Sequence, residues 1–255
     1  MEMTLDEDIV QRLETMSANP APDLSWPTGC YGSAASILVF VGPSPGGSPS
    51  EPTPPPRNPS GGLALWNQAF SEPYDNSPGH WGGKYTYSIP VLVETILGVP
   101  LHKGSDRLYA FANFDWVQSP QEQKVPANRM QAGERDVIRV LLDCKPRIIV
   151  PLTKGAHKRL LTVLSNHRYQ TSQVTCDAMV PISPGRFHRT LDVLKVDGRG
   201  VLATSVVIRS PQHPNRMLSK AHANACARAI RLAYEAVLEG RQRVEITTEQ
   251  CTAPL

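Results

Sequence analysis

The stretch SILVFVGPSPGGSPSEP, residues 36–52, joins an almost uninterrupted apolar run to a segment dominated by Gly, Pro and Ser. Such an apolar run is typical of a strand that is buried on both faces of a parallel sheet. The Gly and Pro residues prevent the strand from continuing beyond Gly42. Ligands of open parallel sheets bind beyond the carboxyl ends of the strands, so this turn marks a candidate site.

Outward from this stretch, strand-like and helix-like segments alternate along the chain. Further apolar strands are predicted at 107–113, at 146–153 and just before residue 210. Helical spacing of apolar residues appears at 133–145, 154–167 and 217–240. This alternation predicts an α/β protein, a three-layer α/β/α sandwich around a central, mainly parallel four-stranded sheet.

The length of 255 residues and a hydrophobic content of 40% are sufficient for one well-buried core. We expect an N-terminal helical extension at 1–20, one domain at 21–240 and a disordered tail at 241–255. The sequence shows no apolar run near the ~20 residues of a membrane span. A cytoplasmic monomer that does not bind membranes is therefore expected.

Composition also excludes several classes of site. The formal net charge of +3 is a weak basic excess, so any contact with nucleic acid must be local. The five cysteines are scattered and have no CxxC spacing, which argues against a disulfide framework, a zinc site and an iron–sulfur cluster. We expect a reducing compartment and no metal or other cofactor.

Three loops at predicted strand ends carry the candidate chemistry. The first, GPSPGG at 42–47, lacks the spacing of phosphate-binding loops, and its prolines remove backbone donors. The second holds Asn113, which could read a base edge, and Asp115, which could act on water; an Asx turn is the structural alternative for both. The third holds His213, for which a structural role is the alternative.

Taken together, these loops resemble those of the uracil-DNA glycosylase superfamily. The matching residues are Gly42, Pro45 and Gly46 after the first strand, Asn113 after the second, and His213, Pro214 and Asn215 after the last. KPRIIVPLTKGAHKRLL, residues 145–161, is similar to the strand and helix start that the family places between them. The resemblance covers roughly residues 36–238.

This resemblance implies a monofunctional DNA glycosylase that hydrolyses the N-glycosidic bond of a flipped pyrimidine and leaves an abasic site. Catalysis would involve Asn113, His213 and Asp115. The base would be bound by Gly42, Ser44, Pro45 and Gly46, with Trp66 or Phe70 stacking on it unless these are core residues. DNA contacts would come from Lys154, Lys158, Arg209, Pro214, Asn215, Arg216 and Met217, of which the last two match the family's wedge; an ordinary solvated surface is the alternative.

Two departures from the family leave the function open. Pro43 and Ser44 stand where many members have an acidic or amide side chain that positions water. Gly46 and Gly47 replace the bulky aromatic residue with which strict uracil enzymes exclude larger bases. Both uracil-type bases in repair and bulkier modified pyrimidines in anti-phage defence are thus possible substrates, and the rival class is a catalytically silent DNA-binding protein on the same fold.

Overall fold

The computed structural model describes residues 4–18, 30–43, 85–99, 108–115, 127–183, 185–197, 200–217 and 219–253. Four short apolar strands form the centre of its sheet, in the order β3 (Tyr109–Asn113), β2 (Leu38–Gly42), β4 (Ile148–Pro151) and β7 (Val206–Ile208). Neighbouring strands in this set are parallel, and all their residues are buried. The predicted parallel centre is therefore confirmed.

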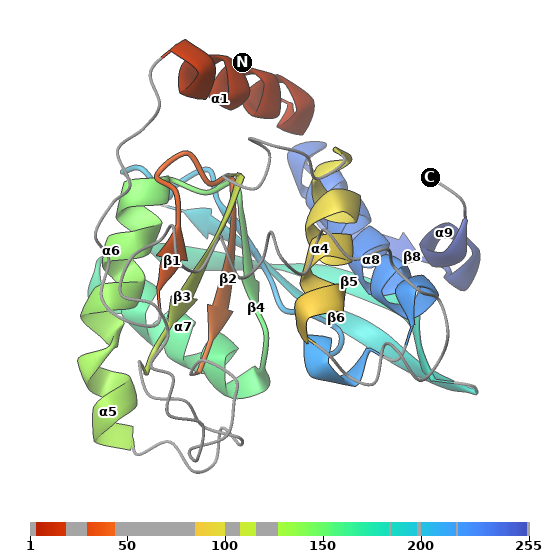
Figure 1. Cartoon of the computed structure of the whole chain (residues 1–255). Coiled ribbons are helices and arrows are strands. Elements are labelled where there is room, and N and C mark those ends of the chain that lie inside the picture. Colours follow the sequence, from red (N-terminus) through yellow and green to blue (C-terminus); the bar gives the residue numbers. More distant parts are fainter. Residues whose placement is uncertain are drawn as a thin grey trace.

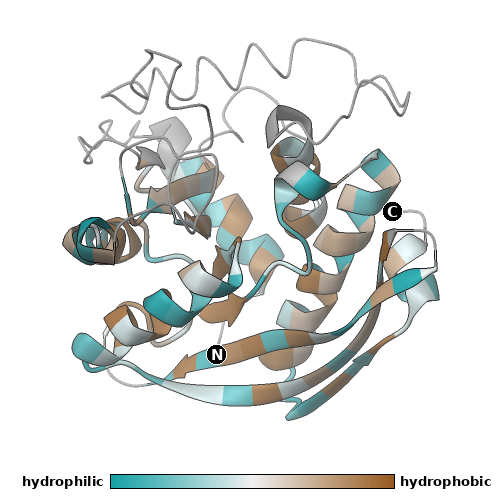
Figure 2. Ribbon diagram, turned by 90° about the horizontal axis from the view of Figure 1, so that it is seen from below, coloured by the Kyte–Doolittle hydropathy of each residue, from teal (hydrophilic) through white to brown (hydrophobic). Residues whose placement is uncertain are grey.

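The sheet extends well beyond these four strands, to eight in the order β1-β3-β2-β4-β7-β6-β5-β8. β1 (Tyr31–Gly32) pairs antiparallel with β3, and β6 (Arg186–Asp197) pairs antiparallel with both β7 and β5 (Gln170–Ser183). The prediction of only four strands was wrong because β5 and β6 alternate buried and exposed residues instead of forming apolar runs. The long strands at the lower edge of Figure 2 accordingly carry both hydrophilic and hydrophobic residues.

Helices cover both faces of the sheet, which confirms the three predicted layers (Figure 1). On one face, Leu38 and Phe40 of β2 belong to an apolar cluster with α4 (Tyr85–Leu97) and α8 (Lys220–Leu238). On the other face, Val39 and Val41 pack with α6 (Glu134–Cys144) and α7 (Lys154–Asn166). The strict alternation along β2 gives each helical layer its own core.

The N-terminal helix α1 (Leu5–Ala18) lies at the amino edge of the sheet, and Figure 1 shows it across the top of the molecule. Leu5 and Ile9 are buried in the core shared with α4 and α8. Arg12 donates hydrogen bonds to the carbonyl groups of Ala35, Ser36, Cys144 and Lys145. The predicted helix is thus packed against the sheet rather than projecting from the domain.

The C-terminal segment differs from the sequence prediction of a disordered tail. Residues Arg243–Ile246 form β8, which pairs parallel with β5, and α9 (Thr248–Thr252) follows. Val244 and Ile246 are buried, and a capping box at Thr247 starts α9. This segment is ordered because two apolar side chains complete the core on the β5 side. Among the described segments, no helix combines the length and apolar character that crossing a bilayer would require.

Candidate functional site

The loops that follow β2, β3, β4 and β7 begin at the same edge of the sheet. Gly42 and Asn113 are neighbours in the parallel register of β2 and β3. The Phe114 N–H donates to the Gly42 carbonyl oxygen at 3.1 Å, and the Ser210 N–H donates to the Pro151 carbonyl oxygen at 2.9 Å. The strand ends that carry the predicted site residues are therefore hydrogen-bonded to one another.

Asn113 is buried at the last position of β3. Because side chains alternate along a strand, Asn113 lies on the same face as Tyr109 and Phe111, which pack in the layer of α4 and α8. Its neighbour Gly42 occupies the corresponding position of β2 and has no side chain on that face. No side chain of β2 therefore stands beside the Asn113 side chain at this register position.

Asp115 is held by Arg129 of α5 (Ala127–Ala132) in a two-pronged ion pair. The Arg129 Nη2–Asp115 Oδ2 distance is 2.5 Å and the Nε–Oδ1 distance is 3.2 Å. The Asp115 side chain is only 1% exposed, whereas that of Arg129 is 37% exposed. Since both carboxylate oxygens are engaged by Arg129, Asp115 anchors the loop after β3 to α5.

The junction between α5 and α6 is in close contact with the loop after β3. A Cβ atom built on Gly133 would lie 1.8 Å from the Phe114 carbonyl oxygen, so only glycine permits the approach. Arg129 of α5 and Gly133 at the start of α6 thus both contact the segment immediately after Asn113. Sequence reasoning identified neither residue, because the contact crosses a long loop and neither carries a recognisable motif.

His213 lies in the loop that joins β7 to α8, directly before the 3-10 helix η3 (Pro214–Arg216). The Ser88 hydroxyl of α4 donates to the Pro214 carbonyl oxygen at 2.9 Å. This bond ties the loop to the helical layer that also covers the Asn113 face. Asn113 at the end of β3 and the loop that carries His213 therefore lie at the same edge of the sheet and toward the same helical layer.

The electrostatic environment of His213 keeps its imidazole neutral. Burial and, to a smaller degree, the positive charge of Arg216 lower the pKa of His213 from its ordinary value of 6.5 to about 4. At neutral pH the ring therefore has one N–H donor and one nitrogen acceptor. Such a ring can donate a hydrogen bond to developing negative charge without a prior protonation step.

The predicted DNA-contact residues have different environments. Lys154, Lys158 and Arg216 are exposed, and Pro214 is buried. The Arg209 Nε lies 2.5 Å from Asp192 Oδ2, so this guanidinium is already paired. Met217 has no exposed surface and packs in the core beside α4 and α8, which is incompatible with its predicted wedge role in this conformation.

Several predicted residues lie outside the described part of the chain. These are Ser44, Pro45, Gly46, Trp66 and Phe70, together with the side chain of Asn215. Within the described residues, no three His, Cys, Asp or Glu side chains are arranged to hold a metal ion. All five cysteines are buried free thiols, and burial raises the pKa of Cys30, beside the Asn113 backbone, to about 12.

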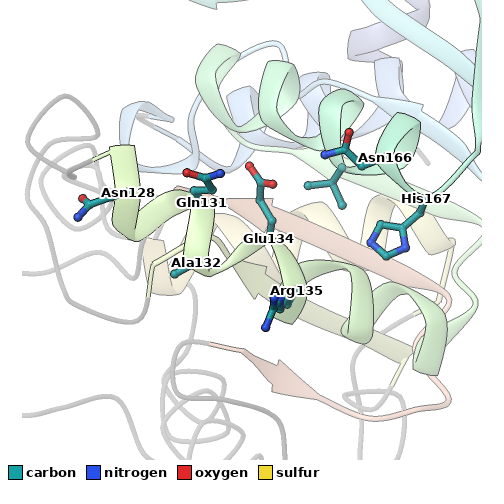
Figure 3. Close-up of a pocket in the computed structure, with 8 residues that line it drawn as sticks. Asn128, Gln131, Ala132, Glu134, Arg135, Asn166 and His167 are labelled. Atoms are coloured by element: carbon teal, nitrogen blue, oxygen red, sulfur yellow. The ribbon is translucent and has the colours of Figure 1, made fainter.

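A separate polar groove of about 540 Å³ lies on the opposite helical layer. Figure 3 shows its lining side chains, which come from α5, the start of α6 and the end of α7. Glu134 in this groove is paired with Arg159 at 2.9 Å. None of the residues predicted for catalysis or base binding lines it. Its chemistry is thus distinct from that of the carboxyl edge.

Comparison with known proteins gives no identification, since no protein-family model matches the chain and no curated protein is significantly similar to it. The functional argument therefore rests on the arrangement of Asn113, Gly42 and His213 at the carboxyl edge.

Proposed function

We propose that the protein is a monofunctional DNA glycosylase that hydrolyses the N-glycosidic bond of a flipped-out pyrimidine and leaves an abasic site. The observation that carries this proposal is the placement of Asn113 beside Gly42 at one strand end, with a neutral His213 in the loop after a second. A carboxamide and a neutral imidazole can both form hydrogen bonds with an uncharged pyrimidine base. Such an enzyme binds a base outside the duplex stack, where its edge is accessible.

In this proposal, Asn113 and His213 have different roles in the reaction. The Asn113 carboxamide offers both a donor and an acceptor, so it can hold the pyrimidine edge and orient the attacking water. As the bond to C1′ breaks, negative charge develops on the base, and an N–H of His213 donates to it. The water oxygen bonds to C1′ as the bond from C1′ to the base nitrogen breaks, and the proton that the water loses ends on the departing base. No covalent enzyme intermediate is required.

A catalytically silent DNA-binding protein is the second candidate. The observation in its favour is the ion pair of Asp115 with Arg129, because it engages the one carboxylate among the predicted site residues. Without a carboxylate to accept a proton from water, hydrolysis must rely on orientation and on stabilising the departing base. We further propose that the protein is monomeric and cytoplasmic; its five free thiols are typical of a reducing compartment.

Single-turnover excision tests the proposal. Duplexes carrying uracil or a bulkier 5-substituted pyrimidine are incubated with excess protein, and abasic sites are then cleaved with alkali. We expect cleavage of one substrate class, with H213A lowering its rate by about 10²-fold, the usual cost of losing one transition-state donor. The matched control is H167A, an exposed histidine at the C-terminal cap of α7, which should leave the rate unchanged.

The choice of substrate follows from the same measurement. Cleavage of the 5-substituted duplex alone would support a role in defence, and cleavage of uracil would support repair. If the protein binds these duplexes but produces no abasic site in any of them, the silent DNA-binding alternative replaces the enzyme.

A further inference from the structure

Strands β5 and β6 continue past their neighbours as a two-stranded ribbon. In β6, only Val193–Lys195 pair with β7, and in β5, only residues 175–178 pair with β8. The segments 179–183 and 186–191 lie beyond the residues that pair with β8 and β7. Within the described residues, 180–183 pairs with 186–188, whereas Thr190 and Leu191 pair with Asp177 and Cys176 of β5. We call the segments 179–183 and 186–191 the β5–β6 arm; its length is about 20 Å at ~3.3 Å per residue.

The topology fixes the direction in which the arm projects. The strand β7 is parallel to β4, and it therefore ends at the carboxyl edge. Because β6 is antiparallel to β7, residues of β6 that precede the paired segment extend beyond that edge. The Arg209 N–H donates to the Asp192 carbonyl oxygen at 3.0 Å, so the loop bearing His213 begins at the base of the arm. Figure 1 shows β5 and β6 extending beyond the central strands.

The arm is positively charged and partly apolar. Arg186 and Arg189 are exposed, and neither forms an ion pair with any described residue. The sequence AMVPISPGRFHRTL, residues 178–191, contains no acidic residue. Phe187 is 40% exposed and Met179 is 39% exposed. The acidic residues nearest to the arm in sequence, Asp177 and Asp192, are both paired with arginines.

We infer that the β5–β6 arm is a DNA-binding element that grips the duplex beside the reacting nucleotide. A two-stranded ribbon fits into a major groove about 12 Å wide, and free guanidinium groups bind phosphate oxygens. Phe187 supplies an apolar surface for contact with the sugar or base edges. The inference rests on the proposed function for DNA as the partner, but it requires no excision chemistry.

The two arginines differ in their surroundings. Arg189 lines a groove of about 700 Å³ together with Glu245 and Glu249, whose negative charges weaken its attraction for phosphate. Arg186 is next to the turn at Gly185, where no atom lies within 4 Å of a constructed Cβ. Arg186 is therefore the principal phosphate contact, and Arg189 the weaker one.

The experiment measures fluorescence anisotropy of a short, unmodified duplex over a series of salt concentrations. Loss of one phosphate contact should lower the slope of log Kd against log salt by about 0.9 and weaken binding by about three- to tenfold. We expect this result for R186A and a smaller effect for R189A. The control is R241A, which removes an arginine that follows the end of α8 and whose side chain is 60% exposed and paired with Glu239.

Each outcome decides the inference. Unchanged affinity and salt slope in both R186A and the double variant R186A/R189A would overturn it. R186Q, which keeps a long polar side chain, serves as a second uncharged variant, and melting curves check that each protein is folded. Light scattering tests whether a second copy of the chain, rather than DNA, binds the open strand edge. If the wild type is a dimer that R186A or F187S separates, the arm mediates self-association and the DNA inference fails.

The duplex contains no excisable base, so this test is independent of catalysis. Arm-dependent binding without excision of any pyrimidine would refute the proposed enzyme and leave the arm intact. Excision with arm-independent binding would refute the arm and leave the enzyme intact.

Discussion

Acidification should destabilise the protein through His213. Burial lowers the pKa of His213 to about 4, whereas in the unfolded chain the imidazole titrates near 6.5. Between these values the unfolded chain binds a proton that the folded protein does not. The free energy of unfolding therefore falls as the pH falls from about 6.5 to about 4, and this contribution is fully present above 6.5.

The expected magnitude follows from the two pKa values. A difference of about 2.5 at about 1.4 kcal/mol for each pH unit gives about 3.5 kcal/mol, and partial exposure of the ring reduces this to about 2–3 kcal/mol. Burial also lowers the pKa values of His157, His188 and His222. The wild type should therefore lose more stability than the share due to His213, and only a comparison with a His213 variant isolates that share.

Urea denaturation of the wild type and H213N at pH values between about 7 and 4 provides the assay. H213N should lose about 2–3 kcal/mol less than the wild type over this interval. In the wild type, the excision rate should show no inflection near pH 6.5, because the folded imidazole is already neutral there. Parallel stability curves for the two proteins, or a rate that follows a pKa near 6.5, would refute the neutral-donor argument.

Three further predictions concern the loop after β3. R129A should lower the free energy of unfolding by about 3 kcal/mol, because it leaves the Asp115 carboxylate buried without its cation. The double variant D115N/R129M should recover most of this loss. Equal losses in the two variants would contradict the ion-pair explanation. G133A should cost at least about 2 kcal/mol, since its Cβ meets the Phe114 carbonyl oxygen, and an unchanged denaturation midpoint would contradict this. N113A should lower the single-turnover excision rate by at least about 10²-fold, whereas D115N should retain more activity; the reverse order would make Asp115 the water-positioning group.

The central strands could be predicted from sequence because burial on both faces removes polar residues from them. The antiparallel extension could not be predicted in the same way. Leu191 and Val193 of β6, for example, are buried on either side of the partly exposed Asp192, so this strand shows no continuous apolar run. Segment 243–253 is mostly polar, and its order depends on Val244 and Ile246 packing against distant parts of the chain, which a local pattern does not reveal.

The candidate site shows the same division. The position of Asn113 and His213 at the carboxyl edge could be predicted because each lies at or after a predicted strand end, and parallel strands bring such positions to one edge. The role of Asp115 depends on Arg129, and the contact between them is set by the path of the intervening loop. Met217 follows the His213 turn as an exposed wedge would, but the bond between Ser88 and Pro214 draws this part of the loop toward α4, and the side chain is buried.

The charges at the carboxyl edge form a pattern that suits a polyanionic partner. Asp115 is neutralised by Arg129 on the loop after β3, and Asp192 is neutralised by Arg209 at the start of the His213 loop. Such pairs contribute little net stability, but an unpaired carboxylate at either position would repel a phosphodiester. With both acids paired, the remaining free charges on the β5–β6 arm are cationic, while the groups proposed to act on the base are neutral. In the proposed enzyme, this arrangement would attract the phosphodiester backbone without placing a fixed negative charge beside a base that departs as an anion.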